Sequence, residues 1–344
     1  MKAKAIQFSG PRQLEIVEET LPEVGEGQIR IKSAYSGISH GTEMNVYRGD
    51  APMWTMQQDP ETRLFIETEE PQWQYPLKYG YCCVGHVTET GTEVTALAPG
   101  DPVFCFAPHQ TENVLSARSV LPLTKEVELK TGVLVANLST TFNGLLDADV
   151  HLNECVVVFG QGVLGQLAVQ WAKMSGASPV VAVDLIDKRL EISKQVSGAD
   201  VTLNPNQVGD VAMEVRKMTE NRGADIVYEL SASDRALHEA IRTACYNGKV
   251  IVMSWYPGTL SNVALGAEFH HNRIQLICSQ TGGTRPALSH RWNMQRRLRS
   301  VVELMPQLNL EPLITDVVSF DHAARAYELI DRHPEDTLQV VFQY

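Results

Sequence analysis

The fold of this chain is decided by the stretch Cys155-Val-Val-Val-Phe-Gly-Gln-Gly-Val-Leu-Gly165. Its apolar residues 155–159 predict a buried strand, and Gly160, Gly162 and Gly165 follow in G-x-G-x-x-G spacing. The first glycine permits a tight turn, the second lets the backbone approach a pyrophosphate, and the third lets a helix lie close to the strand. The stretch therefore predicts a dinucleotide-binding turn whose helix N-terminus faces the phosphates.

A second strand supports this interpretation and indicates which dinucleotide is bound. The apolar run Val180-Val-Ala-Val183 ends at Asp184, about 20 residues after the glycine turn. A carboxylate at this place accepts both ribose hydroxyls of NAD and repels the 2′-phosphate of NADP. We therefore predict NAD as the cofactor. The alternative is a glycine-rich turn followed by an ordinary aspartate at a strand end.

Length, charge and cysteine content limit the class of protein. A chain of 344 residues is too long for one small core, so we expect two domains. The net charge of −12 argues against nucleic-acid or membrane partners and leaves a small-molecule substrate. The N-terminus has no apolar signal core and no apolar run is long enough to span a bilayer, which predicts a cytoplasmic protein. The 6 cysteines show no C-x-x-C spacing and no disulfide framework, and Cys155 and Cys278 are interpreted as buried strand residues.

The order of sequence patterns predicts an α/β protein in three parts. Residues 1–130 contain short β signals punctuated by glycine and proline, as in a small β-barrel. Residues 131–280 alternate strand and helix, which indicates a doubly wound parallel sheet. Residues 281–344 have one long helix near 292–305 and a final strand, and we expect them to rejoin the first domain. The strands predicted in the second part are 155–159, 180–184, 201–203, 226–230, 249–254 and 274–278, and its helices lie near 163–175, 187–196, 208–221 and 234–246.

Taken together, these features resemble the medium-chain dehydrogenase/reductase superfamily, which includes zinc alcohol dehydrogenases and zinc-free quinone and enoyl reductases. The resemblance covers nearly the whole chain and implies a GroES-like β-barrel catalytic domain and a Rossmann dinucleotide-binding domain. Its matching stretches are Ser36–Glu43, Pro99–Val103, the glycine turn, Gly223–Val227, Gly248–Val252 and Ala324–Val341. It implies cofactor contacts from Gly160, Gly162, Val163, Leu164, Gly165, Asp184, Lys188 and Ser231.

The chain departs from the zinc enzymes of that superfamily at each ligand position. Ser39 stands where those enzymes have a cysteine ligand, within Gly37-Ile-Ser-His-Gly-Thr-Glu43. In the next ligand motif, Tyr81 replaces histidine and Cys82 replaces glutamate. The segment 132–144 should supply the third ligand but contains no Cys, His, Asp or Glu. The four-cysteine lobe is also missing, so we predict that both zinc sites are absent.

A novel zinc site is the alternative to that prediction. Zinc needs three or four deprotonated ligands that converge on one point, and His40, Glu43, Cys82 and His86 could be recruited. Adjacent side chains on a strand point to opposite faces, however, so Cys82 and Cys83 cannot both bind one ion.

Without a metal, alcohol oxidation needs a general base and ketone reduction needs the same group as an acid. His40 lies in the loop that lines the superfamily's active site, and Tyr81 occupies a former ligand position. Glu43 would orient one of them, and Ser39 completes the predicted catalytic set. The alternatives are a helix-capping or phosphate-contacting His40, a packing role for Tyr81, and a Glu43 that only stabilises its loop.

The substrate is the least determined feature. A long insertion between Arg48 and Tyr79 carries Trp54, Trp73 and Tyr75, and a basic, aromatic stretch follows at 290–297. Both could shape a polar pocket with stacking surfaces for a sugar, polyol or ring, or could be loop packing and a solvated helix end. The stretches around Ser39 and Tyr81 also loosely resemble the bacteriochlorophyllide hydroxyethyl dehydrogenase group, which implies oxidation of a secondary alcohol.

Three classes of function follow from these observations. The first is a metal-independent, NAD(H)-dependent oxidoreductase that interconverts a secondary alcohol and a ketone. The second is a zinc-free NADPH-dependent enone or quinone reductase, against which Asp184 and the polar loop 39–43 argue. The third is a non-catalytic dinucleotide-binding protein. The resemblance also implies a homodimer paired through the edge strand Arg273–Cys278.

Overall fold

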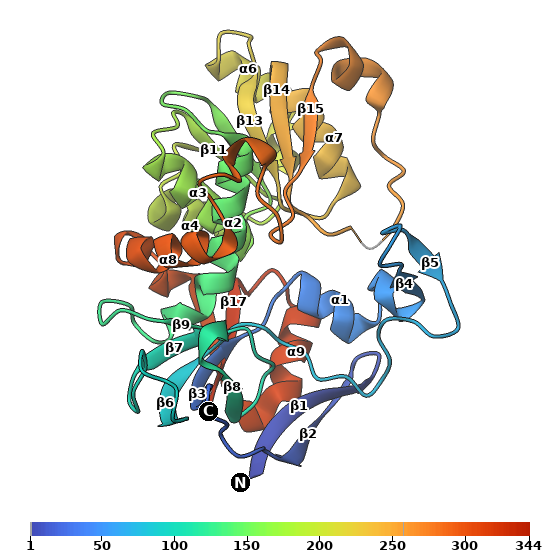
Figure 1. The fold of residues 1–344 in the computed structure, drawn as a ribbon. Coiled ribbons are helices and arrows are strands. Elements are labelled where there is room, and N and C mark those ends of the chain that lie inside the picture. The colour runs from blue at the N-terminus through green and yellow to red at the C-terminus, as the bar shows by residue number, and fades with distance from the viewer. Residues whose placement is uncertain (1, 257) are drawn as a thin grey trace. The chain divides into compact units, whose positions relative to one another are not determined.

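The computed structural model describes residues 2–256 and 258–344, and the chain divides into two compact units. The first unit comprises Met1–Ala136 with Ile314–Tyr344, and the second comprises Asn137–Leu313. Both units combine strands with helices, which confirms the predicted α/β class (Figure 1).

A six-stranded parallel sheet forms the second unit, in the order β12-β11-β10-β13-β14-β15. This is a doubly wound order. Successive strands are added on one side of β10 as far as β12 and then on its other side from β13 onward, and ligands bind beyond the strand ends at this switch. The strands are β10 (Val156–Phe159), β11 (Val180–Val183), β12 (Val201–Leu203), β13 (Ala224–Glu229), β14 (Ala244–Val252) and β15 (Gln275–Cys278).

Helices cover both faces of this sheet, which is why its inner strands β10 and β11 are apolar throughout. Val157 and Phe159 point into a core cluster with Val215 and Ile241, from α6 and α7. The alternate residues of β10 point into a second cluster with residues of α3 and α4. The helices are α2 (Val135–Ala148), α3 (Val163–Met174), α4 (Asp187–Ile192), α5 (Pro205–Val208), α6 (Val211–Met218), α7 (Asp234–Thr243) and α8 (Met294–Leu304).

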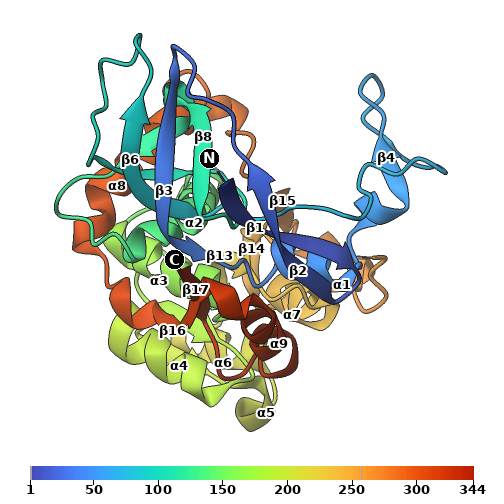
Figure 2. The same ribbon diagram turned by 90° about the horizontal axis from the view of Figure 1, so that it is seen from below.

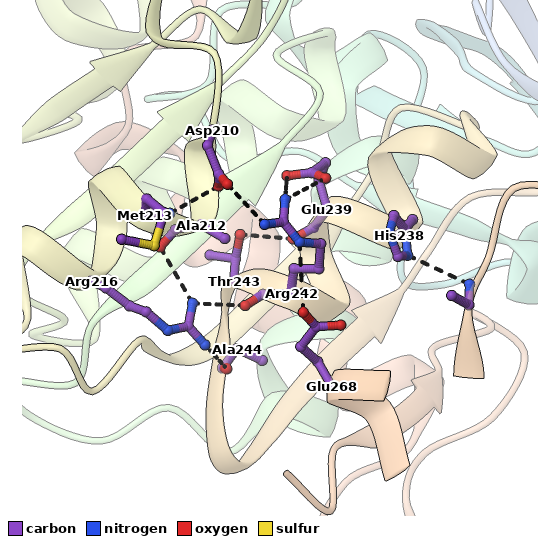
Figure 3. Close-up of polar contacts among 11 residues, drawn as sticks. Asp210, Ala212, Met213, Arg216, His238, Glu239, Arg242, Thr243, Ala244 and Glu268 are labelled. Atoms are coloured by element: carbon purple, nitrogen blue, oxygen red, sulfur yellow. Dashed lines mark hydrogen bonds and ion pairs between the residues drawn. The ribbon is translucent and has the colours of Figure 1, made fainter. Parts of the chain in front are cut away.

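On the side of the unit formed by α6 and α7, an ionic cluster surrounds Arg242 of α7 (Figure 3). Its guanidinium donates to Asp210, the N-cap of α6, at 2.8 Å and to Glu239 at 2.8 and 2.9 Å. Glu268, in the helical turn Leu265–Phe269, lies 3.8 Å from its Nε. The pKa of Asp210 is lowered, first by its hydrogen bond from Arg242.

A seven-stranded sheet forms most of the first unit, in the order β16-β17-β3-β6-β7-β9 with β8 paired to β3. The last strand of the chain, β17, is antiparallel to β3, so the C-terminus completes a sheet begun near the N-terminus. The strands are β3 (Gln28–Gly37), β6 (Cys83–Thr90), β7 (Pro102–Cys105), β8 (Glu112–Ser116), β9 (Val120–Pro122), β16 (Ile314–Ser319) and β17 (Gln339–Gln343).

Two helices and two smaller sheets complete the first unit. Helix α9 (Ala323–Arg332) buries Ala323, Tyr327 and Ile330 along one face, beside residues of α1 (Thr42–Arg48). Strands β1 (Lys2–Gly10) and β2 (Gln13–Thr20) form a hairpin. The insertion predicted from the sequence folds partly into a second hairpin, β4 (Met56–Gln58) and β5 (Phe65–Glu67), which projects from the rest of the unit (Figure 2).

The unit boundaries differ from the predicted boundaries after residues 130 and 280. The first boundary falls inside α2, a helix that the sequence analysis did not anticipate. The second falls at residue 313 because α8 packs on α2: the buried Arg297 donates from Nε to Ser139 at 3.0 Å and from Nη1 to Asn143. Residues 281–313 therefore belong to the second unit.

Two further expectations were wrong in detail. The helix predicted near 208–221 is two short helices, because Gly209 has a φ of 76° and Asp210 caps a new helix. Cys278 is exposed, since β15 is the outer strand of its sheet, whereas Cys155 is buried as predicted. Within residues 2–256 and 258–344, every helix is too short or too polar to pass through a bilayer.

Candidate active site and cofactor site

The glycine turn of the second unit has the backbone geometry that the sequence predicted. Gly160 follows β10 with a φ of 88°, a conformation that side chains rarely adopt. A Cβ on Gly165 would lie 1.9 Å from the carbonyl oxygen of Gly160, so only glycine lets α3 approach the strand this closely. A Cβ on Gly162 would meet nothing within 4 Å. Open space therefore lies at the N-terminus of α3, where no side chain caps the free N–H groups.

Ser231 lies on the other side of the same turn. Phe159 and Glu229 are partners in the register of β10 and β13, so the residues after them adjoin at the strand ends. The amide nitrogen of Ser231 is 2.8 Å from the position of a Cβ on Gly160. Ser231 is fixed by Glu229, which is fully buried and accepts from its N–H at 2.8 Å and from its hydroxyl at 2.5 Å. Glu229 also accepts a hydrogen bond from Tyr256.

Asp184 is joined directly to the glycine turn. Its Oδ2 accepts from the Gln161 N–H at 2.6 Å and its Oδ1 accepts from the Ile186 N–H at 2.9 Å. Each carboxylate oxygen has a second lone pair, so the half-buried group can still accept ribose hydroxyls. The turn and Asp184 thus fit a dinucleotide. Of the remaining predicted contacts, Val163 is buried and Leu164 half-buried in α3, and Lys188 is exposed on α4.

The predicted catalytic loop lies in the first unit, between β3 and α1. Ser39 and His40 are half-buried, and Glu43 is fully buried although it lies in the first turn of the helix. One carboxylate oxygen, Oε2, accepts from the backbone N–H of Ser39 at 3.1 Å. Glu43 therefore fixes the conformation of the loop that precedes it.

The other oxygen of Glu43 is bound by two side chains that the sequence analysis did not identify. Oε1 lies 2.8 Å from Nε2 of His109 and accepts a hydrogen bond from the Tyr327 hydroxyl. His109 is fully buried in the loop between β7 and β8, and Tyr327 is in α9. In the sequence, the glycine at position 80 is the one residue that relates to the place of His109. Gly80 has a φ of 116°, and a Cβ there would lie 2.7 Å from the His109 ring.

The network continues from His109 to the C-terminus. Its Nδ1 is 2.6 Å from the Ser36 hydroxyl, which is 2.8 Å from the hydroxyl of Tyr344. We call these six residues the Glu43 network: Ser36, Ser39, Glu43, His109, Tyr327 and Tyr344.

Tyr81 lies next to this network, as its predicted catalytic role requires. Burial raises the pKa of its phenol, the charge of Glu43 raises it further, and a side-chain hydrogen bond with Ser39 opposes the shift. Burial also raises the pKa of the Tyr79 phenol to about 12, and the rings of Tyr79 and Tyr81 meet edge to face at 6.2 Å. Tyr81 is thus a protonated phenol near neutral pH, which suits a proton donor. The structure brings Ser39, Glu43 and Tyr81 together, with His40 in the same turn.

The residues at the expected ligand positions do not fit a zinc ion. Both oxygens of Glu43 are already acceptors within its network, and the Cys82 thiol has a pKa raised well above its usual value by burial and by the Glu43 charge. Across the described parts of the chain, the only three Cys, His, Asp or Glu side chains close enough to share an ion are His333, Glu335 and Asp336, which are exposed. The absence of zinc stays a prediction.

Aromatic side chains connect the insertion to Tyr81. The rings of Trp54 and Tyr75 stack at 4.1 Å, and Trp54 meets Trp73 edge to face at 5.8 Å. Trp73 then meets Tyr79 at 5.6 Å, and Tyr79 contacts Tyr81. We call these five residues the aromatic ladder. Trp54 Nε1 and the Tyr75 hydroxyl are buried and have no hydrogen-bond partner among residues 2–256 and 258–344.

The chain is similar to known dehydrogenases over most of its length. Residues 163–294 match a family model described as zinc-binding dehydrogenase. The chain is 30% identical to D-guloside 3-dehydrogenase of Escherichia coli strain K12 over 352 residues, which cover 98% of this chain and 99% of that protein. It is 27% identical to L-threonine 3-dehydrogenase of Pyrococcus abyssi, over 92% of this chain and 91% of that enzyme.

The fold is shared with solved structures across its whole length. The galactitol-1-phosphate dehydrogenase structure from Escherichia coli superimposes with a TM-score of 0.81 at 20% sequence identity, covering 99% of this chain and 100% of that one. This confirms a GroES-like unit combined with a Rossmann unit.

Proposed function

Because the chain belongs to the family of zinc-binding, medium-chain dehydrogenases, we propose that it is a metal-independent, NAD(H)-dependent oxidoreductase that interconverts a secondary alcohol and a ketone. Its general activity is that of its relatives, an alcohol–ketone oxidoreductase that uses a pyridine nucleotide. The preference for NAD, the independence from metal and the kind of alcohol are the proposed parts.

The observation that carries the choice of NAD is Asp184 beside the glycine turn. Its carboxylate bonds to the backbone of Gln161, so its charge is held at the edge where the adenosine ribose would lie. A 2′-phosphate there would meet that negative charge at close range. Lys188, exposed on α4, is near enough in sequence to contact the cofactor but follows an intact carboxylate.

Metal independence is supported by the chemistry of the residues at the former ligand positions. Ser39 and Tyr81 are neutral, Cys82 is a thiol held protonated by burial, and both oxygens of Glu43 already accept hydrogen bonds, from three donors in all. Zinc requires deprotonated ligands that are free to converge, and these four residues do not provide them.

Proton transfer is then assigned to a side chain of the first unit. Bound NAD(H) would supply or accept the hydride. Tyr81, whose phenol is protonated at neutral pH, would donate the proton that a nascent alkoxide needs in ketone reduction. Ser39, which interacts with the Tyr81 phenol, would position it, and His40 in the adjoining turn would pass the proton on.

A polyhydroxylated or ring-bearing alcohol is the proposed substrate class. The aromatic ladder offers flat faces and two unpartnered polar atoms, and its last residue is Tyr81. The relative D-guloside 3-dehydrogenase is named for a sugar derivative. We further propose a cytoplasmic homodimer paired through β15, whose exposed Leu276 and Cys278 lie on the outer strand of the sheet.

The experiment is an initial-rate comparison of the purified protein with NAD⁺ and NADP⁺ against a panel of glycosides, polyols and simple secondary alcohols. We expect turnover of a glycoside or polyol with a kcat/KM for NAD⁺ at least tenfold above that for NADP⁺. Turnover confined to activated alkenes or quinones with NADPH would establish the reductase class instead. Tight NADH binding without turnover of any compound would reject a catalytic role.

A further inference from the structure

The Glu43 network has a direction that follows from the chemistry of its members. An ionised carboxylate only accepts hydrogen bonds, so Nε2 of His109 donates to it, as do the Tyr327 hydroxyl and the Ser39 N–H. A neutral His109 then has a bare Nδ1, which accepts from the Ser36 hydroxyl at 2.6 Å. The Ser36 oxygen in turn accepts from Tyr344 at 2.8 Å.

Every donor in this arrangement has an acceptor and every donor points toward Glu43. Burial raises the pKa of Tyr327 and of Tyr344, so both phenols keep the protons that the arrangement needs. In a region with little water, hydrogen bonds in series polarise one another and strengthen the last one. The charge of the buried carboxylate is thus stabilised by a chain of neutral groups as well as by direct contacts.

We propose that the donor chain Tyr344–Ser36–His109–Glu43 positions the catalytic loop by fixing the carboxylate that holds the Ser39 N–H. This inference rests on the proposed function of Ser39 and Tyr81 and names His109, Ser36 and Tyr344 as positioning residues for that site. None of the three is assigned to touch the substrate.

The placement of the chain supports a positioning role over simple packing. Its members come from β3, α1, the loop before β8 and the residue after β17, so they connect the loop to four separate parts of the unit. Tyr344 borders an open cavity of about 360 Å³ lined also by Lys2, Lys4 and Phe320, on whose ring Tyr344 stacks at 4.7 Å. The donor chain therefore runs from Tyr344, which borders this cavity, to the carboxylate of Glu43, which has no exposure.

A matched pair of serines in one strand tests the proposal. Ser36 and Ser33 are both buried in β3, but the Ser33 hydroxyl donates to the Gln110 carbonyl at 2.5 Å and lies outside the Glu43 network. We expect Ser36→Ala to raise the hydrogen-exchange rate of the Ser39 amide about tenfold or more, the effect of losing roughly one hydrogen bond. Its kcat should fall by a similar factor while KM for the cofactor stays within about twofold.

Ser33→Ala should leave the Ser39 exchange rate and kcat within about twofold of the wild type. Ser36→Thr retains the hydroxyl and should restore both quantities. Tyr344→Phe, at the cavity end of the chain, gives a second variant that leaves the buried core intact, and its effect should have the sign of Ser36→Ala and be smaller. Equal behaviour of Ser36→Ala and Ser33→Ala would overturn the proposal.

The ring nitrogen of His109 that carries the proton shows directly which way the hydrogen bonds of the donor chain run. Nitrogen-15 correlation spectra of the full chain at neutral pH should show a proton on Nε2 and none on Nδ1. A proton on Nδ1, alone or together with Nε2, would contradict the chain as described. Exchange rates and tautomers are read without turnover, so an inactive wild-type protein would reject the proposed function while these results would still decide the role of the network.

Discussion

Glu43 in the first unit and Arg242 in the second are each surrounded by charged and polar groups, and these two clusters differ in their access to water. Glu43 in the first unit has no exposed surface and receives hydrogen bonds from Ser39, His109 and Tyr327. Arg242 in the second unit keeps 27% of its side chain exposed and pairs with Asp210 and Glu239 (Figure 3).

The difference shows what burial demands of a charged group. Removing a carboxylate from water costs several kcal/mol unless donors replace the lost solvent, so each oxygen of Glu43 has at least one defined donor. Arg242 is still hydrated and its ion pairs are screened by salt, so its partners add little to stability. The first cluster therefore specifies one loop conformation, whereas the second joins helices that are already packed.

Replacing Glu43 should have the largest effect. Glu43→Ala leaves His109, Tyr327 and the Ser39 N–H buried without their acceptor, and each unsatisfied buried donor costs about 1–3 kcal/mol. Urea denaturation of the full chain measures this loss. A decrease below about 1 kcal/mol would mean that Glu43 is no more critical than a surface charge.

The glycine turn separates a packing requirement from a binding requirement. Gly165→Ala forces a Cβ to within 1.9 Å of the Gly160 carbonyl, and overpacking of this kind costs about 1–3 kcal/mol. Gly162→Ala meets no neighbour, and its φ of −67° suits alanine, so stability should change by less than about 0.5 kcal/mol. Its NADH affinity, measured by calorimetry, should fall about tenfold or more because the methyl group fills the phosphate space.

Asp184→Asn tests whether charge rather than shape selects the cofactor. The amide has the size of the carboxylate and can still accept from the Gln161 N–H, so the glycine turn should keep its structure, but its NH₂ group cannot accept from the Ile186 N–H. The ratio of kcat/KM for NADH to that for NADPH should fall by about tenfold, equivalent to roughly 1.4 kcal/mol. An unchanged ratio would show that another group sets the preference.

Arg242→Gln should have the smallest effect, about 1 kcal/mol or less at neutral pH. Asp210 has a pKa lowered mainly by Arg242, so its contribution is complete above the unfolded-state pKa of about 3.9 and is lost as the pH falls through the lower folded value. The stability difference between wild type and variant should therefore shrink below about pH 4. A difference that grows on acidification would contradict this assignment.

The sequence was sufficient for the second unit because its signals are local. Gly160, Gly162 and Gly165 each satisfy a backbone requirement within one turn, and the alternating strands and helices fix the order of the sheet. Asp184 lies where the chain distance from that turn indicates. The boundary at residue 313 was missed because it depends on Arg297, a buried side chain that bonds a helix more than 150 residues earlier.

The Glu43 network could be predicted only in part, because its partners are distant in the chain. Ser39, Glu43 and Tyr81 were identified from two short motifs, but His109 and Tyr327 were not. His109 lies 66 residues after Glu43, and Tyr327 lies 284 residues after it. Only the folded sheet, in which the C-terminal strand β17 pairs with β3, brings these segments together.

The central claim is that hydrogen bonds rather than a metal organise the catalytic loop. The most direct measurement is the zinc content of the purified protein set against its dehydrogenase rate before and after treatment with a strong chelator. We predict less than about 0.1 zinc per chain, a rate unchanged by the chelator, and no gain on adding zinc, since the residues at the expected ligand positions do not fit the ion. About one zinc per chain, with a rate lost on chelation and restored by zinc, would contradict the claim.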